Sequence, residues 1–321
     1  MADKPSRALV LYGDGLARFI DPSHTHLHSL ASKASCGFLS LPNSPASERE
    51  DERLVREFAI LLDVCEAYLN SDANSTKDEF QNKSMIPTIS ERFMGMKAAI
   101  ITNNSTLKSF GVKFGFSVLQ YNELNRINQP RAEPLETFVA SELLKLLGFH
   151  EGKALDMSQF DLVFVHVGAG EKVNDEKGET ISNDMEYFNS LVGGVLHEAQ
   201  PGSEISSRLH LSVVMSYGSV LEDDNNSNLS VLINKNGKSS KLAPLFPRQS
   251  YTMKGENQRK DVRHHFPMLI AQWQHAVTRK DMAEAFSFED FMQHGGNLVI
   301  PADRFLHEIA FKLWKAPKYG A

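Results

Sequence analysis

Four short apolar runs, separated by helical patterns, constrain the fold of this 321-residue chain more than any other feature. The runs are 8–12, 98–102, 162–167 and 209–216, and the helical patterns are 53–69, 106–114, 134–147 and 182–199. A strand that is buried on both faces reads as a nearly continuous apolar run. We therefore predict an α/β fold with a doubly wound, mostly parallel sheet flanked by helices.

The chain has the length of one large domain or two small ones, and we predict a single α/β domain over residues 1–321. The polar segments 70–83 and 221–228 are expected to be surface loops. Prolines become frequent beyond residue 241, and a helix is expected at about 301–315. We interpret residues 244–321 as a C-terminal helical extension packed on the core.

Composition narrows the class of protein. A net charge of −6 argues against a protein built to grip nucleic-acid phosphates. The two cysteines, Cys36 and Cys65, do not make a secreted disulfide framework. The apolar runs are much shorter than the ~20 residues that span a bilayer as a helix. The sequence therefore predicts a cytoplasmic or nuclear protein that does not interact with membranes.

Two of the predicted strands run into polar, glycine-rich ends. The first continues into Gly13-Asp14-Gly15, and the third continues into residues 168–171, which end in Glu171. Ligands of doubly wound sheets bind beyond the carboxyl ends of the strands. Asp14 is thus a candidate metal ligand, although an aspartate between glycines is also a common turn residue.

Three stretches in the right order resemble the alkaline-phosphatase superfamily, and specifically the archaeal-type cofactor-independent phosphoglycerate mutases. Residues 11–16 (LYGDGL) and 24–31 (HTHLHSLA) are similar to a D-G-L strand end followed by a T-P-N-L-D-x-L-A helix. Residues 98–116 resemble the strand, helix and G-x-x-x-G segment that precedes the family's last carboxylate strand. Residues 161–170 and the helix after them resemble its V-H-V-x-A-x-D-x-x-x-H element. The resemblance implies a parallel sheet with two divalent metals at its strand ends.

The metal ligands implied by the resemblance are largely replaced in this sequence. Asp14 matches the first carboxylate, whereas Glu171 and Asp175 stand where the family has aspartate and histidine. A charged surface loop without metal is the favoured interpretation of Glu171 and Asp175. The segment 216–218 (Ser-Tyr-Gly) replaces an Asp-His pair. One of His264 and His265 is a candidate for the family's late histidine ligand, although an exposed or half-buried helix face is the favoured interpretation of this pair. If a metal site survives, its mostly oxygen donors favour Mg²⁺ or Mn²⁺. Otherwise we expect no cofactor.

Two further parts of the family pattern are missing or reduced. Ser40, Ser44 and Ser47 lie in the interval where the nucleophile is expected, but none stands in a motif that identifies it, so the catalytic residue is unknown. The family's large cap domain is expected to be reduced or absent, because only about eighty residues separate Leu16 from Ala98.

Four other histidines are weaker candidates. His24, His26 and His28 would share one side of a strand, but the resemblance places them at the start of a helix, where their side chains diverge. A metal triad is therefore not expected. His166 lies inside a predicted strand and is interpreted as a core histidine with its hydrogen bonds satisfied.

Two functions compete on these observations. The favoured hypothesis is a catalytically degenerate alkaline-phosphatase-like protein that acts as a binding or scaffolding module for a protein partner or a small phosphorylated ligand. The alternative is a metal-dependent phosphohydrolase or phosphomutase with a rearranged site of Asp14, Glu171, Asp175 and one of His264 and His265. Nucleic-acid binding through the basic stretch 248–263 is the least favoured, because the chain is acidic overall.

Overall fold

The computed structural model describes residues 6–45, 48–65, 87–124, 135–168, 177–219, 253–254, 257–258, 262–263, 266–296 and 299–317. The strands are β1 (Arg7–Asp14), β2 (Ser35–Ser40), β3 (Ala98–Ile101), β4 (Ser117–Leu119), β5 (Phe149–His150), β6 (Lys153–Ala154), β7 (Leu162–Gly168), β8 (Leu209–Met215), β9 (Met253–Lys254), β10 (Asn257–Gln258), β11 (Met268–Trp273) and β12 (Val299–Pro301). The helices are η1 (Leu16–Phe19), α1 (Thr25–Ala31), α2 (Glu50–Leu61), α4 (Ile89–Arg92), α5 (Ser105–Lys113), α6 (Tyr121–Leu124), α7 (Leu135–Leu146), α8 (Lys177–Glu198), α9 (Glu204–Arg208), α10 (Phe288–His294), η5 (Ala302–Arg304) and α11 (Phe305–Lys312).

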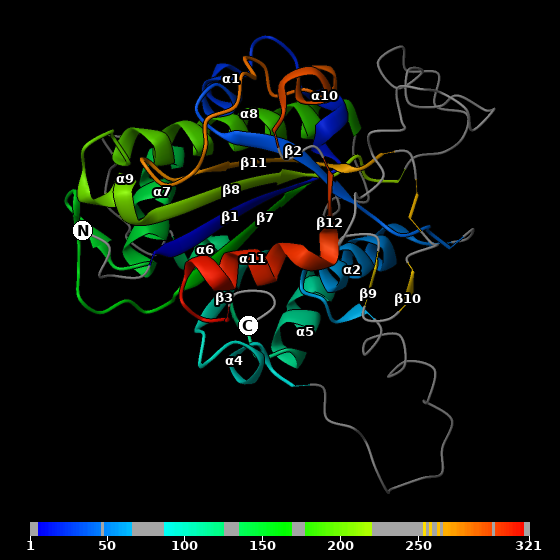
Figure 1. The fold of residues 1–321 in the computed structure, drawn as a ribbon, viewed down its shortest axis with the longest axis horizontal. Helices are drawn as coiled ribbons and strands as arrows, with labels where there is room; N and C mark the ends of the chain where they lie inside the picture. The colour runs from blue at the N-terminus through cyan, green and yellow to red at the C-terminus, as the bar shows by residue number, and fades with distance from the viewer. Residues whose placement is uncertain are drawn as a thin grey trace, which may run out of the picture.

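The central sheet has eight strands in the order β12-β2-β11-β8-β1-β7-β3-β4 (Figure 1). β1 lies in the interior and pairs in parallel with β7 on one side and β8 on the other. β11 pairs antiparallel with both β2 and β8, so it runs against the other strands of this sheet. The predicted doubly wound, mostly parallel α/β architecture is confirmed, and all four predicted strands belong to it.

Helices cover both faces of the sheet (Figure 1). Successive residues of β1 alternate between two buried clusters: Leu9 and Leu11 pack with α1, α7, α8 and α10, whereas Val10 and Tyr12 pack with α2, α5 and α11. This two-sided burial explains why β1 reads as an unbroken apolar run. The interval between η1 and β3 adds α1, β2, α2 and α4 to these layers, and its described residues contain no separate cap domain.

The C-terminal segment differs from the prediction. It does contain α10 and α11, but β11 lies in the interior of the sheet and β12 extends its edge. Residues 244–321 are therefore not a helical extension packed on a finished core. The six residues of β11 are all buried, and they join β2 to β8. The apolar run between Pro267 and Gln274 is as long as the strands that were predicted, but it lies in a segment rich in prolines and charges that was interpreted as a helical extension.

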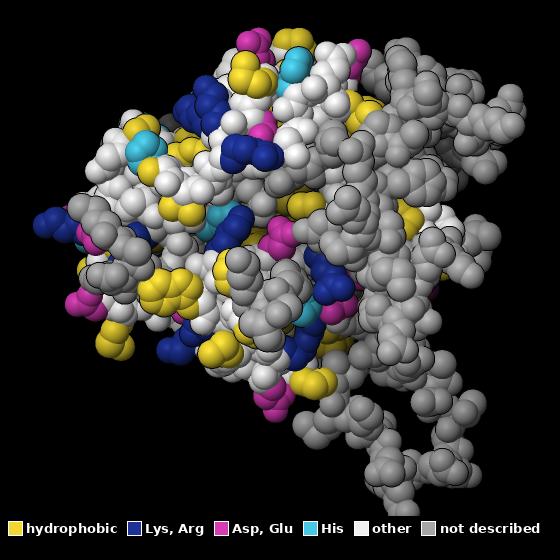
Figure 2. Space-filling view, viewed as in Figure 1, with side chains coloured by type: hydrophobic (Ala, Val, Ile, Leu, Met, Phe, Trp, Pro, Cys, Tyr) yellow, Lys and Arg dark blue, Asp and Glu magenta, His cyan; other side chains and the backbone are white. Residues whose placement is uncertain are grey.

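The polar segments 70–83 and 221–228, expected to be surface loops, lie outside the described residues. On the face shown in Figure 2, basic and acidic side chains of the described part are interspersed. Among the described residues, no helix combines the length and apolar character needed to cross a bilayer.

Candidate functional site at the strand ends

Asp14 is held at the centre of the carboxyl edge of the sheet. It is the last residue of β1, and in the parallel register it lies opposite Gly168 at the end of β7. A Cβ atom at position 168 would come within 2.6 Å of the Asp14 Cβ atom, so glycine is required for this close approach. Gly15 then turns the chain away with a φ of 69°, a conformation that glycine adopts readily.

The side chain of Ser216 orients Asp14. Ser216 follows β8 directly, and its backbone N–H donates to the Gly13 carbonyl at 3.0 Å. Its Oγ donates to Asp14 Oδ1 at 3.1 Å and accepts from the Gly15 N–H at 3.0 Å. The sequence identified residues 216–218 only as the place where an Asp-His pair is missing. Ser216 supports the retained carboxylate, although it supplies no charge.

A buried arginine meets Asp14 where a metal would be expected. Arg53 projects from the first turns of α2, and its Nη2 atom lies 2.6 Å from Asp14 Oδ1. The exposed fractions of the two side chains are only 4% for Arg53 and 3% for Asp14. The ion pair is therefore almost fully shielded from water. Sequence reasoning did not identify Arg53 as part of the site.

Arg53 also joins two glutamates of its own helix. Its Nη1 atom donates to Glu57 Oε2 at 2.8 Å, and its Nη2 atom lies 2.5 Å from Glu50 Oε1. The hydroxyl of Tyr12 donates to the same Glu57 oxygen at 2.8 Å. We call Asp14, Arg53, Glu50 and Glu57 the Arg53 cluster. It is a hydrogen-bonded network in which one guanidinium donates to three carboxylates.

The pKa values of the buried pair reflect this arrangement. Burial alone would lower the pKa of Arg53, but the neighbouring Asp14 and Glu57 carboxylates outweigh it and raise that pKa above its ordinary value. For Asp14, burial acts to raise the pKa, whereas the Arg53 guanidinium and the nearby His166 together hold it well below its ordinary value. Both side chains are thus charged at neutral pH.

His166 lies on the other side of Asp14, on β7. Its Nδ1 atom is hydrogen-bonded to Thr102 Oγ1 at 2.9 Å, and its Nε2 atom lies 4.0 Å from Asp14 Oδ2. The Nε2 atom is buried without a hydrogen-bond partner. His166 is therefore a core histidine, as predicted, but only one of its two ring nitrogens is satisfied.

Within the described strand ends, no set of side chains is arranged to hold a divalent metal. Asp14 Oδ1 is already bound by Arg53 and Ser216. A Mg²⁺ ion bound to this oxygen would lie about 2.1 Å from it and would have to displace the guanidinium. Among the described residues, no group of three or more His, Cys, Asp or Glu side chains could hold an ion. The other predicted ligands, Glu171, Asp175, His264 and His265, lie outside the described residues, so their positions stay predictions.

The other candidates are distributed over the fold. Ser40 ends β2, which β11 and β8 separate from β1, so it does not adjoin Asp14. The ring of His24 accepts from the Asp21 N–H at 2.9 Å, and His28 Nδ1 accepts from the Phe286 N–H at 3.0 Å. His26 faces Gly193 of α8 instead. The three histidines diverge, as expected for the start of a helix.

The side chain of Tyr217 lies away from Asp14. Its ring is buried in the core cluster on the opposite face of the sheet, 5.5 Å from the ring of Phe266. The space beside Asp14 is taken by Arg53. A signal for this was present in the sequence: Arg53, Arg56 and Glu57 stand at helical spacings of three and four, within a run of apolar residues. Charges on such a face need partners inside the protein.

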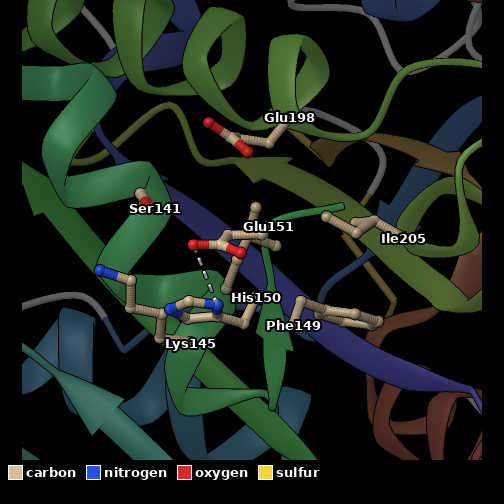
Figure 3. A pocket seen from close by; sticks show the side chains of 8 residues that line it. Ser141, Lys145, Phe149, His150, Glu151, Glu198 and Ile205 are labelled. Atoms are coloured by element: carbon tan, nitrogen blue, oxygen red, sulfur yellow. Dashed lines mark ion pairs between the residues drawn. The ribbon is translucent and has the colours of Figure 1, made fainter. Parts of the chain in front are cut away.

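A cavity of about 260 Å³ lies away from this site. It is lined by residues of α7, β5, α8 and α9, including Lys145, His150 and Glu198 (Figure 3). Because α8 and α9 lead into the start of β8, this cavity is near the amino edge of the sheet. The Arg53 cluster is at the carboxyl edge.

Comparisons with known proteins concern the fold. No protein-family model matches the chain, and no curated protein matches it by sequence. The PH0037 protein from Pyrococcus horikoshii superposes over 99% of this chain and 99% of its own, with a TM-score of 0.56 and 12% identity. This chain shares its fold with PH0037. At 12% identity the likeness concerns the fold alone.

Other similar structures are more distant. One is an alkaline phosphatase superfamily protein from Vibrio parahaemolyticus, with a TM-score of 0.46 and 12% identity over 87% of this chain and 62% of that one. Another is the cofactor-independent phosphoglycerate mutase from Thermoplasma acidophilum, with a TM-score of 0.46 and 10% identity over 96% and 99% of the two chains.

Proposed function

We propose that this chain is a catalytically degenerate alkaline-phosphatase-like protein that acts as a binding or scaffolding module. The observation that supports this proposal is the buried ion pair between Arg53 and Asp14. In a two-metal enzyme the metals polarise the phosphoryl group and activate the nucleophile. Here a guanidinium contacts the one matching carboxylate. It neutralises the charge of that carboxylate, but it has no open coordination position for a substrate.

The ion pair between Arg53 and Asp14 is difficult to break, because arginine stays protonated at every physiological pH. A divalent ion at Asp14 would face a positive charge held within hydrogen-bond distance of the same oxygen. To admit the ion, Arg53 would have to leave Glu57, which is fully buried, as well as Asp14. Uncoupling a buried charge from its partners costs several kcal/mol. The Arg53 cluster is therefore a structural element in this proposal.

We propose a protein or a small phosphorylated ligand as the partner. The alternative function, a phosphohydrolase or phosphomutase with Mg²⁺ or Mn²⁺, requires Arg53 to swing away and Glu171, Asp175 and a late histidine to converge on Asp14. The unpartnered Nε2 atom of His166 is the observation that favours it, because this atom faces Asp14. The two proposals differ in what they predict for metal binding.

The test combines metal content with turnover. After extensive dialysis against buffer containing Mg²⁺ or Mn²⁺, and then metal-free buffer, elemental analysis should find no stoichiometric metal. An aryl phosphate and a phosphoglycerate should not be turned over with either ion. Stoichiometric metal, or turnover that disappears in Asp14→Ala, would overturn the proposal in favour of the enzyme. Turnover that survives Asp14→Ala would point to a contaminating phosphatase.

A further inference from the structure

Ser44 occupies an unusual position near the Arg53 cluster. It lies at the surface in the connection from β2 to α2, and its Oγ atom accepts hydrogen bonds from two arginines. Arg56 Nη2 and Arg263 Nη1 each lie 3.0 Å from this oxygen. The arginines come from distant parts of the sequence, α2 and the segment that precedes β11. Two guanidiniums that converge on one hydroxyl form the kind of site that binds a phosphate.

Both arginines are held in place by other contacts. Arg56 Nε lies 2.5 Å from Glu48 Oε1, and the exposed fraction of the Arg56 side chain is 8%. Arg263 donates from its backbone N–H to the Leu41 carbonyl at 3.0 Å and from Nη2 to the Phe266 carbonyl at 2.7 Å. The positions of the two guanidiniums are therefore set before any anion arrives.

Each arginine also has one nitrogen whose N–H group makes no hydrogen bond. Arg56 Nη1 and Arg263 Nε are buried and have no hydrogen-bond partner. Burial lowers the pKa of Arg263 below its ordinary value, which reflects a guanidinium short of compensating charge. An unsatisfied buried donor is unfavourable, and a group that brings acceptor oxygens to it is stabilised. A hydroxyl offers one oxygen at this place, whereas a phosphate offers three more.

The sequence around Ser44 supplies a second, independent observation. The residue after it is Pro45, and serine followed by proline is the minimal motif for proline-directed protein kinases. Residues 43–45 form neither helix nor strand and are exposed. A kinase can therefore reach this segment without unfolding an element of the sheet or a helix. Once the segment returns to its place, its modified side chain points at Arg56 and Arg263.

We propose that Ser44 is a phosphorylation site for a proline-directed protein kinase, and that Arg56 and Arg263 hold the resulting phosphate. Ser44 Oγ attacks the terminal phosphorus of ATP, its proton passes to the catalytic base of the kinase, and the bond to ADP breaks. The phosphoserine carries nearly two negative charges at neutral pH. It competes with Glu48 for Arg56 and ties the β2–α2 connection to the segment before β11. This proposal does not depend on the proposed function.

One experiment tests both halves of the proposal. The full-length protein is incubated with a proline-directed kinase and ATP, and the site is mapped by mass spectrometry, with Ser44→Ala as the control. Phosphoserine placed at position 44 by genetic encoding should raise the Tm by about 2–4 °C. Phosphoserine at position 23 is a matched control, because the Ser23 hydroxyl is exposed and donates to Asp21 instead of accepting from arginines. It should lower the Tm or leave it unchanged.

A second readout does not require an arginine variant that could misfold. The ³¹P chemical shift of the position-44 phosphoprotein is titrated in the folded state and in urea. The second phosphate pKa, ordinarily near 6, should be lower in the folded protein by about one unit, because two cations favour the dianion. Equal pKa values in the two states, no Tm increase at position 44, or no phosphate at Ser44 after kinase treatment would each overturn the proposal.

Discussion

Arg53 is the buried cation of the candidate site, and its environment determines what it contributes to stability. The Arg53 side chain is 4% exposed and is shared among three carboxylates. Removing this cation while its carboxylates remain lowers the free energy of unfolding strongly, whereas replacing the whole buried group by apolar side chains can change it little. Its loss leaves Asp14 and Glu57 as uncompensated charges in the core. An arginine at the surface near the same helix contributes much less, because water compensates the charges of its ion pair.

We therefore expect Arg53→Ala to lower the free energy of unfolding by about 3–5 kcal/mol. Urea denaturation monitored by circular dichroism measures this change. Arg49→Ala is the matched control, because Arg49 is bonded to Glu52 at the start of α2 with 82% of its side chain exposed, and its substitution should change the unfolding free energy little. Similar losses for the two variants would contradict a structural role for the buried cluster.

At the scale of secondary-structure elements, β11 is the strand that completes the sheet. It contacts β8 along one edge and β2 along the other, and both pairings are antiparallel. Without it, β2 and β12 would have no neighbour that connects them to β1. A strand in this position is expected to be as important for stability as the four predicted from the sequence.

Substitution of Ile270 tests this expectation. Its side chain is 2% exposed and belongs to the cluster beneath α2 and α11, so Ile270→Ala should lower the unfolding free energy by about 2–5 kcal/mol. Val277, just after the strand, is 61% exposed, and Val277→Ala should change it by less than about 0.5 kcal/mol. Chemical denaturation of both variants measures the difference. A small loss for Ile270→Ala would place β11 outside the stable core.

At the scale of the whole molecule, Asp14 links stability to pH. Its pKa in the folded state lies well below the ordinary value of 3.8, so the unfolded chain takes up the proton first as the pH falls. The stability that Asp14 contributes is fully present above pH 3.8 and is lost as the pH falls from there toward the folded-state pKa. Comparison with a variant at this position cancels the contributions of carboxylates that lie far from Asp14.

The difference in unfolding free energy between the wild type and Asp14→Asn should therefore be constant from pH 7 to about pH 5. Below pH 4 it should shrink by about 1.4 kcal/mol for each pH unit. Urea unfolding at a series of pH values measures it. A difference that stayed constant down to pH 3 would mean that Asp14 is not held ionised by Arg53.

The sequence by itself determined the architecture around β1. Its apolar runs predicted four buried parallel strands, and Gly13-Asp14-Gly15 predicted a carboxylate at the edge where ligands bind. These features are local, since burial on both faces and a turn after a strand leave their mark in consecutive residues. Ser216 was located at its strand end, but its bond to Asp14 joins residues 202 positions apart.

Only the tertiary structure decided what Asp14 binds. Arg53 lies 39 positions away on a different element, and although its apolar neighbours indicate a buried charge, they do not indicate which carboxylate it binds. The packing of α2 on the sheet turns that face inward and closes the ion pair. The tertiary structure also decided the place of β11 in the sheet. A six-residue run becomes an interior strand only when strands on both sides, here β2 and β8, pair with it.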